Sequence, residues 1–234
     1  MPAVLNPLRS APGRRARLPA SDARGQLLDA AIALFAERGI ANTTVAQIAA
    51  SGDVTSAMVH YWFDTRARLL DAVVQERLAP LFRSIWEPAD VDQGAPLELV
   101  RGIVGRLFDV TEKTPWLPSL WLREIINEGG LLRERALRHI PLKRVAGFGQ
   151  NIARGQSRGE VNSEIEPLLV FNSILALVML PQATAKIWRH INPTLTLDRA
   201  ALERHVSGLL MHGIAGQQAQ GPARRRHGKA KAAA

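Results

Sequence analysis

The sequence contains no cysteine among its 234 residues, which excludes disulfides, thiolate nucleophiles and cysteine-ligated metal centres. It also lacks a long apolar run, since the most hydrophobic stretch, residues 168–180, is interrupted by Asn172 and Ser173 and a membrane-spanning helix needs roughly 20 residues. No two of the six histidines are three or four residues apart and no Glu-x-x-His motif occurs, which argues against a di-iron bundle. We therefore expect a soluble, cytoplasmic protein without membrane contact, metal or cofactor.

Positive charge is concentrated at the two ends of the chain. The formal net charge is +9, and residues 1–20 and 217–234 together contain nine basic side chains and no acidic one. Residues 21–216 are neutral, with 21 basic and 21 acidic side chains. Basic ends indicate either contact with a polyanion such as nucleic acid or a solubilising role, and charge alone does not decide between them.

Apolar residues recur at helical spacing along almost the whole chain, and no alternating strand pattern is present. The predicted class is all-α. A first helix is expected to begin at Ser21 and end at Gly39, short helices at Thr44 and Thr55, and a longer one at Asp64–Thr65. Beyond residue 88, helices are predicted over 95–113, 116–128, 131–157 with a break at Pro141, 166–190 and 198–215.

The segment from Thr44 to Phe63 fits a helix-turn-helix. Thr44 and Gln47 form a capping box, Thr55 caps the second helix, and the turn between them contains Gly52 and Asp53. Its small core is expected to consist of Ile48, Ala49, Val54, Val59 and Phe63. The pattern alone also fits an ordinary helical hairpin.

A family resemblance is carried by the run Thr43-Thr44-Val45-Ala46-Gln47-Ile48-Ala49, followed by Val54-Thr55, Val59-His60-Tyr61-Trp62-Phe63, Arg66 and Leu69-Leu70. Over residues 24–72 the chain resembles TetR-family transcriptional regulators element by element. The resemblance implies a basic arm over 1–20, a helix-turn-helix DNA-binding domain over 21–68, an effector-binding and dimerisation domain over 69–216 and a basic tail over 217–234. Asp53 stands where the family usually has glycine, and aspartate tolerates the left-handed conformation, with Gly52 adding freedom to the turn.

The same resemblance implies roles for individual residues. Thr44 and Arg66 correspond to phosphate contacts at helix N-termini, and Tyr61 and Trp62 to contacts with the sugar–phosphate backbone. Trp62 also fits an alternative in which it packs against the fourth helix. The full set of expected DNA-binding residues is Thr44, Thr55, Ser56, Ala57, Met58, His60, Tyr61, Trp62 and Arg66.

The C-terminal bundle is expected to dimerise and to bind a small effector. A two-fold interface is predicted on helices 166–190 and 198–215, because the first is apolar on more than one side and the second places Leu202, Val206, Leu209, Leu210 and Gly213 on one face. The predicted effector pocket comprises Leu99, Ile103, Leu107, Phe108, Trp116, Leu120, Trp121, Arg123, Glu124, Asn127, Phe148, Phe171, Asn172 and Leu175. Aromatic residues at this helical spacing are more often plain core than part of a pocket.

One pattern favours a different activity. Residues 155–159 match the G-x-S-x-G pattern of serine hydrolases, but a helical pattern precedes them where that motif needs a strand, and the glycines indicate the end of a helix. No other group of titratable residues converges, so we do not expect an enzyme or any catalytic residue.

The predicted function is that of a DNA-binding transcriptional repressor. Its partners are expected to be a palindromic double-stranded operator, a second copy of the chain and a small, largely apolar effector that releases it from DNA. The alternative is a helical small-molecule-binding or interaction module that does not bind DNA.

Overall fold

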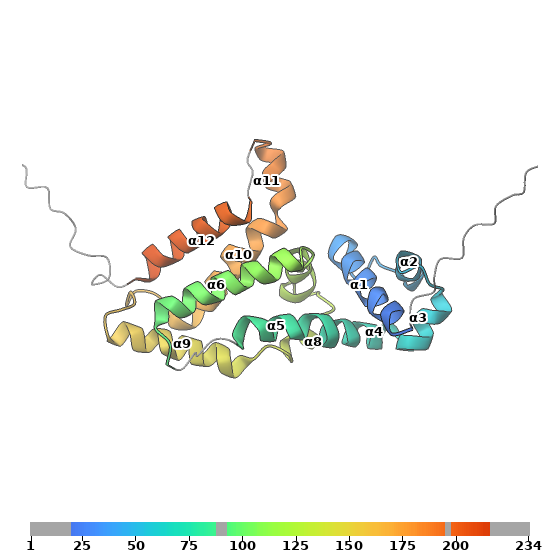
Figure 1. The fold of residues 1–234 in the computed structure, drawn as a ribbon, viewed down its shortest axis with the longest axis horizontal. Helices are drawn as coiled ribbons and strands as arrows, with labels where there is room; N and C mark the ends of the chain where they lie inside the picture. The colour runs from blue at the N-terminus through green and yellow to red at the C-terminus, as the bar shows by residue number, and fades with distance from the viewer. Residues whose placement is uncertain (1–19, 88–92, 195–197, 216–234) are drawn as a thin grey trace, which may run out of the picture.

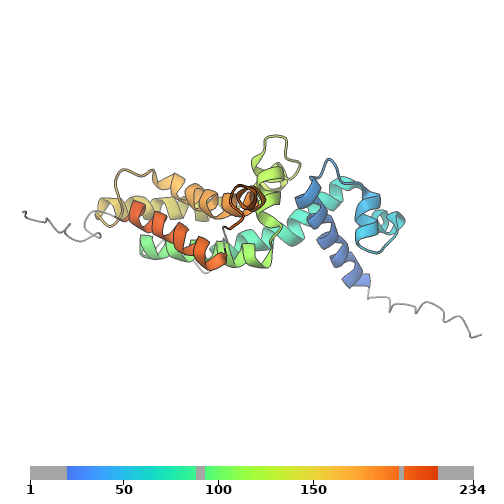
Figure 2. The same cartoon turned by 90° about the horizontal axis from the view of Figure 1, so that it is seen from above.

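The computed structural model describes residues 20–87, 93–194 and 198–215 (Figure 1). Regular structure in these ranges is helical, apart from one isolated β-bridge between Val161 and Ala215, which confirms the predicted all-α class. Figures 1 and 2 show an elongated molecule with a small helical unit at one end and a larger bundle at the other. The predicted basic tail, and all of the predicted arm except Ala20, lie outside the described residues.

The small unit comprises α1 (Ala20–Arg38), α2 (Val45–Ser51), α3 (Ser56–Phe63) and α4 (Arg66–Val73). These helices share one core because each contributes apolar residues at helical spacing. The buried apolar side chains are Leu27, Leu28, Ala31, Ile32, Phe35, Ile40, Ile48, Ala49, Val59, Phe63, Leu69 and Leu70. Val54, expected among them, is only partly buried. The described part of α1 begins at Ala20, and the side chain of Ser21, the predicted cap, lies outside the described part of the protein.

Three consecutive helices begin with a capping threonine. The hydroxyl of Thr44 accepts from the Gln47 N–H at 3.2 Å, and the Gln47 side chain accepts from the Thr44 N–H at 2.8 Å. Thr55 and Thr65 accept from the N–H three residues further on, each at 3.3 Å. These bonds satisfy donors that a first helical turn leaves free and so fix where α2, α3 and α4 start. The predicted capping box and the cap at Thr55 are confirmed.

The turn between α2 and α3 sets the angle of the two helices. Asp53 adopts the left-handed conformation, with a φ of 54°, as predicted. Gly52 has an unstrained φ of −91°, but a Cβ there would lie 2.9 Å from the Cδ1 of the fully buried Leu27. Glycine at position 52 therefore permits close packing on α1, a role that the sequence did not indicate.

A continuous helix connects the small unit to the bundle. It consists of α4, the π-helical segment η1 (Val74–Leu78) and α5 (Ala79–Trp86), with helical backbone angles at both junctions. Pro80 has no N–H to donate within the helix, and the π-helical widening lies directly before it. The predicted long helix is confirmed, and the expected domain boundary after residue 68 falls inside α4.

The bundle contains α6 (Pro96–Lys113), α7 (Leu117–Leu120) continuing into the π-helical η2 (Trp121–Ile126), α8 (Arg133–Leu137), α9 (Leu142–Ser157), the 3-10 turn η3 (Pro167–Leu169), α10 (Val170–Ala183), α11 (Ala185–Ile191) and α12 (Arg199–Ile214). The helix α12 packs against α6 and α10, and Arg199 joins it to α6 through ion pairs with Asp109 and Glu112. The helix α7 packs against both α10 and α1, which brings the bundle against the small unit.

The predicted single helix over 166–190 is divided in the structure. The segment ending at Ala183 and α11 are bent by 59° relative to each other at Thr184. Pro181, inside α10, removes a backbone donor just before the bend and accounts for it. No single helix of the described residues is both long and apolar enough to cross a membrane. Only this bent pair, taken together, has the length and the apolar composition of a membrane-spanning segment.

The G-x-S-x-G segment is helical. Ser157 is the last residue of α9, and its hydroxyl donates to the Arg154 carbonyl at 2.8 Å, so it occupies no strand-to-helix elbow. Gly159, with a φ of 74°, follows the end of the helix. Gly155 lies within α9, where a Cβ would come 2.7 Å from Pro96, so it is required for close packing and does not end the helix as predicted.

Candidate nucleic-acid interface

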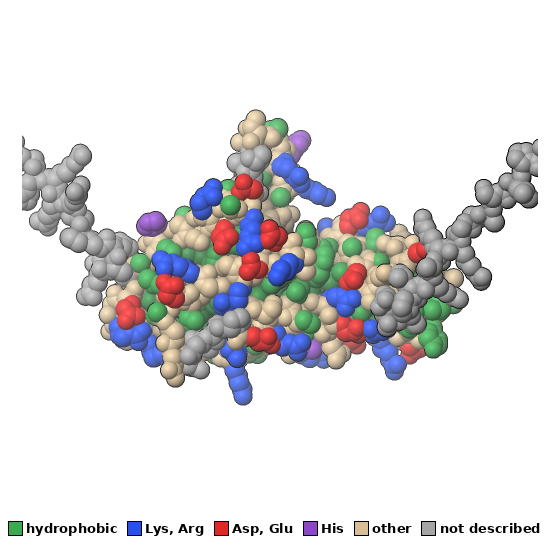
Figure 3. Space-filling model, in the orientation of Figure 1, with side chains coloured by type: hydrophobic (Ala, Val, Ile, Leu, Met, Phe, Trp, Pro, Cys, Tyr) green, Lys and Arg blue, Asp and Glu red, His purple; other side chains and the backbone are tan. Residues whose placement is uncertain are grey.

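The helix α3 has one buried side and one side that the protein leaves in solvent. Val59 and Phe63 are 2% and 3% exposed, whereas Ser56 and Ala57 are exposed and Tyr61 is 79% exposed. Figure 3 shows hydrophobic side chains gathered at the surface over the end of the molecule where α3 lies. The outward side therefore offers a hydroxyl, a methyl group and an aromatic ring with a polar tip, which suit contact with DNA base edges and backbone.

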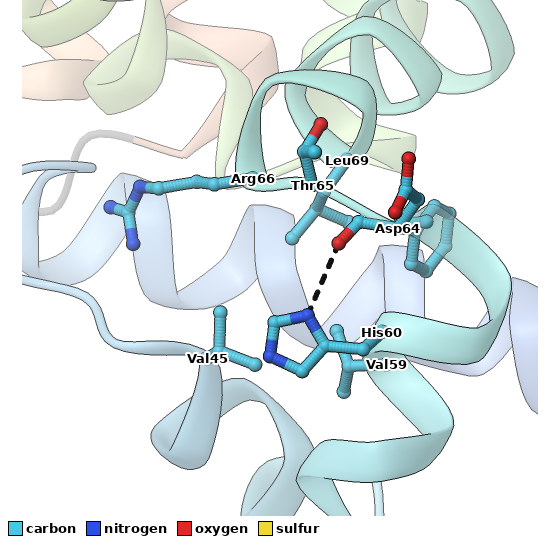
Figure 4. Close-up of a pocket in the computed structure, with 8 residues that line it drawn as sticks. Val45, Val59, His60, Asp64, Thr65, Arg66 and Leu69 are labelled. Atoms are coloured by element: carbon cyan, nitrogen blue, oxygen red, sulfur yellow. Dashed lines mark hydrogen bonds between the residues drawn. The ribbon is translucent and has the colours of Figure 1, made fainter.

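Met58 and His60 lie on α3 between its buried side and its outward side. Met58 is partly buried. His60 is exposed, and its Nδ1 donates to the Asp64 carbonyl at 3.2 Å, which turns the ring toward the start of α4 (Figure 4). The hollow beside this ring, bordered by Val45 and Leu69, measures about 10 Å³, room for one water molecule at most. His60 thus lies at the α3–α4 junction.

Arg66 is engaged inside the protein. Its Nη1 donates to the Thr43 carbonyl at 2.7 Å and its Nη2 donates to the Ile40 carbonyl. Figure 4 shows the guanidinium directed away from the His60 ring. The side chain, which the family resemblance assigned to a phosphate contact, therefore holds the loop between α1 and α2, a role that sequence reasoning missed.

Thr44 and Thr55 are exposed at the starts of α2 and α3. Each hydroxyl oxygen accepts a capping bond, so its proton remains available to a phosphate oxygen. Trp62 is only partly buried and packs against the core, which favours the packing alternative over a contact with the DNA backbone.

This surface has little positive charge of its own. Residues 21–68 contain four basic and five acidic side chains. Arg68 pairs with Asp64 at 3.4 Å, and Arg66 is bound to carbonyl groups. Attraction to phosphates must therefore come from helix N-termini and from residues outside this region.

The helix-turn-helix has a counterpart among known proteins. Residues 27–73 match the family model described as bacterial regulatory proteins, tetR family. The chain therefore contains a TetR-family DNA-binding domain. Like the curated regulators that it matches, the chain is a DNA-binding transcriptional regulator and not an enzyme.

Further similarities extend beyond the DNA-binding unit of the chain. The HTH-type transcriptional regulator BetI of Paraburkholderia phymatum is 26% identical over 143 residues, which are 58% of this chain and 71% of BetI. FadR of Bacillus subtilis, solved in complex with stearoyl-CoA, has 20% identity and a TM-score of 0.59, covering 82% of this chain and 99% of that one. The hemolysin II regulator HlyIIR has 19% identity and a TM-score of 0.58, over 81% of this chain and 98% of that one. Both structures share the fold of this chain, a small helical unit followed by a larger helical bundle.

The first helix of the chain is tied to the connecting helix. Arg24 on α1 forms a two-pronged pair with Glu76 on η1, at 2.6 and 2.7 Å. The hydrogen bonds from Arg24 hold the pKa of the Glu76 carboxyl below its usual range, and the pKa of Arg24 is raised in turn. Arg77 adds bonds to Asp29 at 2.5 Å and to the Gly25 carbonyl at 2.9 Å. These contacts fix the helix-turn-helix against η1.

A second connection crosses from the bundle to the DNA-binding unit. Glu124 on η2 is only 6% exposed, and its Oε1 accepts from the Ile40 N–H at 2.9 Å. Its Oε2 accepts from the Leu131 N–H at 3.2 Å. The peptide groups of Ile40 are therefore held from two sides, the N–H by Glu124 and the carbonyl by Arg66. Glu124 was expected among the polar contacts of an effector pocket, and no pattern in the sequence indicated this role.

The remaining predicted pocket residues fall into three groups. Those in the core are Leu99, Ile103, Leu107, Phe108, Leu120, Trp121 and Phe148. Those partly buried against it are Trp116, Phe171 and Leu175. Arg123, Asn127 and Asn172 are exposed, because the helical phase of η2 and α10 turns them away from the core, so the structure does not bring them to the pocket.

Aromatic rings meet in the core around α5. Trp86 lies 4.7 Å from Phe171 and 5.9 Å from Phe148, measured between ring centroids. Phe82 and Trp121 meet edge to face at 5.9 Å. The Nε1 of Trp121 is buried and has no hydrogen-bond partner among the described residues, which is unusual for an indole donor.

The predicted dimer residues on α12 do not share one surface. Leu202, Val206 and Leu210 are at most 6% exposed and belong to the protomer's own core, since α12 packs on α6 and α10. Their assignment to an interface was wrong. Leu209 is 51% exposed and Gly213 is exposed, so these two remain available to a partner.

Proposed function

We propose that the protein is a repressor that binds a palindromic operator as a homodimer and is released by a small, largely apolar effector. The proposal that α3 reads DNA rests on one observation: one side of α3 packs on the core, and the opposite side is exposed. Ser56 can hydrogen-bond a base edge, and Ala57 can contact a thymine methyl group. Operator binding implies action in the cytoplasm, where bacterial DNA lies.

Phosphate contacts on either side of α3 would set its register on the duplex. The exposed hydroxyl of Thr55 and the first N–H groups of α3 lie at the positive pole of that helix. Tyr61, with its ring in solvent, is suited to pack on the sugar–phosphate backbone. By the family resemblance, Thr44 contributes a similar contact from the start of α2.

A second copy of the chain is proposed to pack on the outward side of α10 and α12. Leu180 is 50% exposed and Leu209 is 51% exposed, so each helix leaves an apolar side chain in solvent. A Cβ on Gly208 or Gly213 would meet nothing within 4 Å, which leaves room for close approach of a second helix. Dimerisation would place two α3 helices about one DNA turn, ~34–36 Å, apart.

The effector is proposed to bind in the bundle core beside Trp121. The aromatic rings of Trp86, Phe82 and Phe148 supply apolar surface there, and the unpaired Nε1 of Trp121 supplies one donor. A ligand with an apolar body and one hydrogen-bond acceptor fits this chemistry. FadR, which shares this fold, was solved in complex with stearoyl-CoA, a molecule with a long apolar chain.

Release from DNA is proposed to pass through η2. Trp121 and Glu124 lie on the same π-helical segment, and Glu124 holds the loop that precedes α2. A ligand that displaces η2 would weaken the bond to Ile40 and change the position of the helix-turn-helix. The ligand must bind the released state better than the DNA-bound state, and couplings of this kind amount to about 1–3 kcal/mol.

The test is operator affinity by fluorescence anisotropy, with DNA from upstream of the protein's own coding sequence. Ala57→Glu places a carboxylate on the exposed side of α3 and should weaken binding by roughly a hundredfold, because like charges across an interface cost several kcal/mol. Ala153→Glu makes the same change on the exposed side of α9 and serves as control. Equal affinity for both variants, with folding verified by circular dichroism, would exclude α3 as the reading helix.

A further inference from the structure

A polar hollow of about 260 Å³ lies between the connecting helix and α8, two elements that pack side by side (Figure 1). It is lined by Asp71, Val74, Gln75, Arg135, Arg138 and His139. None of these residues belongs to the α3 surface or to the aromatic core around Trp121. The hollow therefore needs an explanation of its own.

Cationic groups outnumber anionic groups in the lining. Asp71 supplies the single carboxylate, and it already accepts from the Arg135 Nε at 2.7 Å. The Arg135 Nη1 donates to the Leu131 carbonyl at 3.1 Å, which leaves its Nη2 available. Arg138 and His139 make no side-chain hydrogen bond or ion pair with any other residue that the structure describes. One full positive charge in the lining is thus uncompensated.

The backbone beside the hollow is irregular. Val74 and Gln75 belong to η1, and π-helical segments of this length occur frequently at functional sites. The carboxamide of Gln75 is exposed to the hollow and has no hydrogen-bond partner within the described ranges. The lining thus combines free donors from two elements that are far apart in sequence.

We propose that this hollow binds a small anion carrying a carboxylate or phosphate group. The guanidinium of Arg138 supplies the charge and two parallel donors, a geometry that matches carboxylate and phosphate oxygens. His139 and Gln75 supply further donors from opposite walls. The volume is large enough for an anion of several heavy atoms.

A bound anion would join α8 to the connecting helix. Arg135 in the lining donates to the Leu131 carbonyl, and the N–H of Leu131 donates to Glu124, so two hydrogen bonds connect the hollow to the residue that holds Ile40. The anion would therefore act close to the connection between the bundle and the DNA-binding unit. This site is separate from the proposed apolar effector and does not depend on it.

The test is isothermal titration of the full chain with inorganic phosphate and, separately, with citrate, at constant ionic strength. We expect saturable binding of one anion per chain, and the stronger of the two ligands distinguishes a phosphate from a carboxylate site. Arg138→Gln and His139→Gln should each weaken binding about tenfold, as expected for loss of a charge-assisted hydrogen bond. Arg133→Gln removes the same charge from α8 outside the hollow and should leave affinity unchanged.

Thermal unfolding of each variant shows whether the fold is retained. Absence of saturable binding by both anions would overturn the proposal, as would an equal loss in Arg133→Gln. Weaker DNA binding by Arg138→Gln in a protein that binds neither anion would assign these cations to DNA phosphates, and the proposal would also fail.

Discussion

The carboxylate of Glu124 accepts a hydrogen bond from the backbone N–H of Ile40, at 2.9 Å, although the two residues are 84 positions apart. Glu124 belongs to the bundle, and Ile40 belongs to the loop that positions α2. A buried charged side chain is retained here because both of its oxygens are satisfied by backbone donors, from Ile40 and Leu131. The contact makes the position of the helix-turn-helix depend on the conformation of η2.

Glu124→Ala should destabilise the protein by about 2 kcal/mol, because the buried N–H of Ile40 and the partly buried N–H of Leu131 lose their acceptor. Chemical denaturation measures this change. Hydrogen exchange at the Ile40 amide should accelerate more than exchange in the core of α9. Glu128→Ala, at an exposed position shortly after η2, is the matched control and should change neither quantity. Unchanged Ile40 exchange in Glu124→Ala would show that the contact carries no constraint.

The pair of Arg24 and Glu76 predicts a dependence of stability on pH. Because its pKa is lower in the folded protein, Glu76 contributes stability above about pH 4.3, the usual pKa of free glutamate, and loses it as pH falls further. Glu76→Gln should therefore flatten the acid limb of the stability curve. At pH 7 the loss should stay below about 1 kcal/mol, since both side chains are about one third exposed. Urea midpoints between pH 3 and 7 measure both effects, and parallel curves would contradict them.

Leu209 and Leu210 are neighbours in sequence with opposite surroundings. Leu209→Glu should leave the stability of the fold within about 0.5 kcal/mol and convert dimers into monomers, because the side chain is in solvent in a single protomer. Leu210→Glu should instead destabilise the protomer by about 3 kcal/mol or more, because it buries a carboxylate in the core. Sedimentation and thermal unfolding separate the two outcomes. Leu142→Glu, at another exposed leucine, is the control, and dimeric Leu209→Glu would exclude the proposed interface.

The basic arm should supply attraction that the helix-turn-helix lacks. Residues 1–20 contain four arginines and no acid, and they lie outside the described residues except for Ala20. Their deletion should weaken binding to all DNA sequences similarly and flatten the log–log salt dependence by ~0.9 for each phosphate group that the arm neutralises. Deletion of residues 217–234 should have a smaller effect. Operator affinity from about 50 to 200 mM salt tests this, and an unchanged slope without the arm leaves it only a solubilising role.

Features that depend on a few consecutive residues were predictable from the sequence. The caps at Thr44 and Thr55 and the left-handed Asp53 follow from local hydrogen bonding and backbone sterics, so α2 and α3 lie where they were expected. The bend at Thr184 also had a local signal, because Pro181 interrupts the helical pattern.

Features that depend on tertiary contacts were not predictable in this way. Helical spacing places Leu202, Val206 and Leu210 on one side of α12, but it does not tell whether that side meets the same protomer or a second copy. The roles of Arg66 and Glu124 arise from loop carbonyl and N–H groups more than 20 residues away. No pattern of spacing connects such partners.

The central claim is that two copies of α3 read the two halves of a palindromic operator. Affinities for a panel of single base-pair changes, compared between wild type and Ser56→Ala, test it most directly. Removal of one hydrogen bond to a base should reduce discrimination at one position in each half-site, related by two-fold symmetry, by about 1–3 kcal/mol per position. A uniform loss across all positions, or a change in one half-site alone, would contradict the claim.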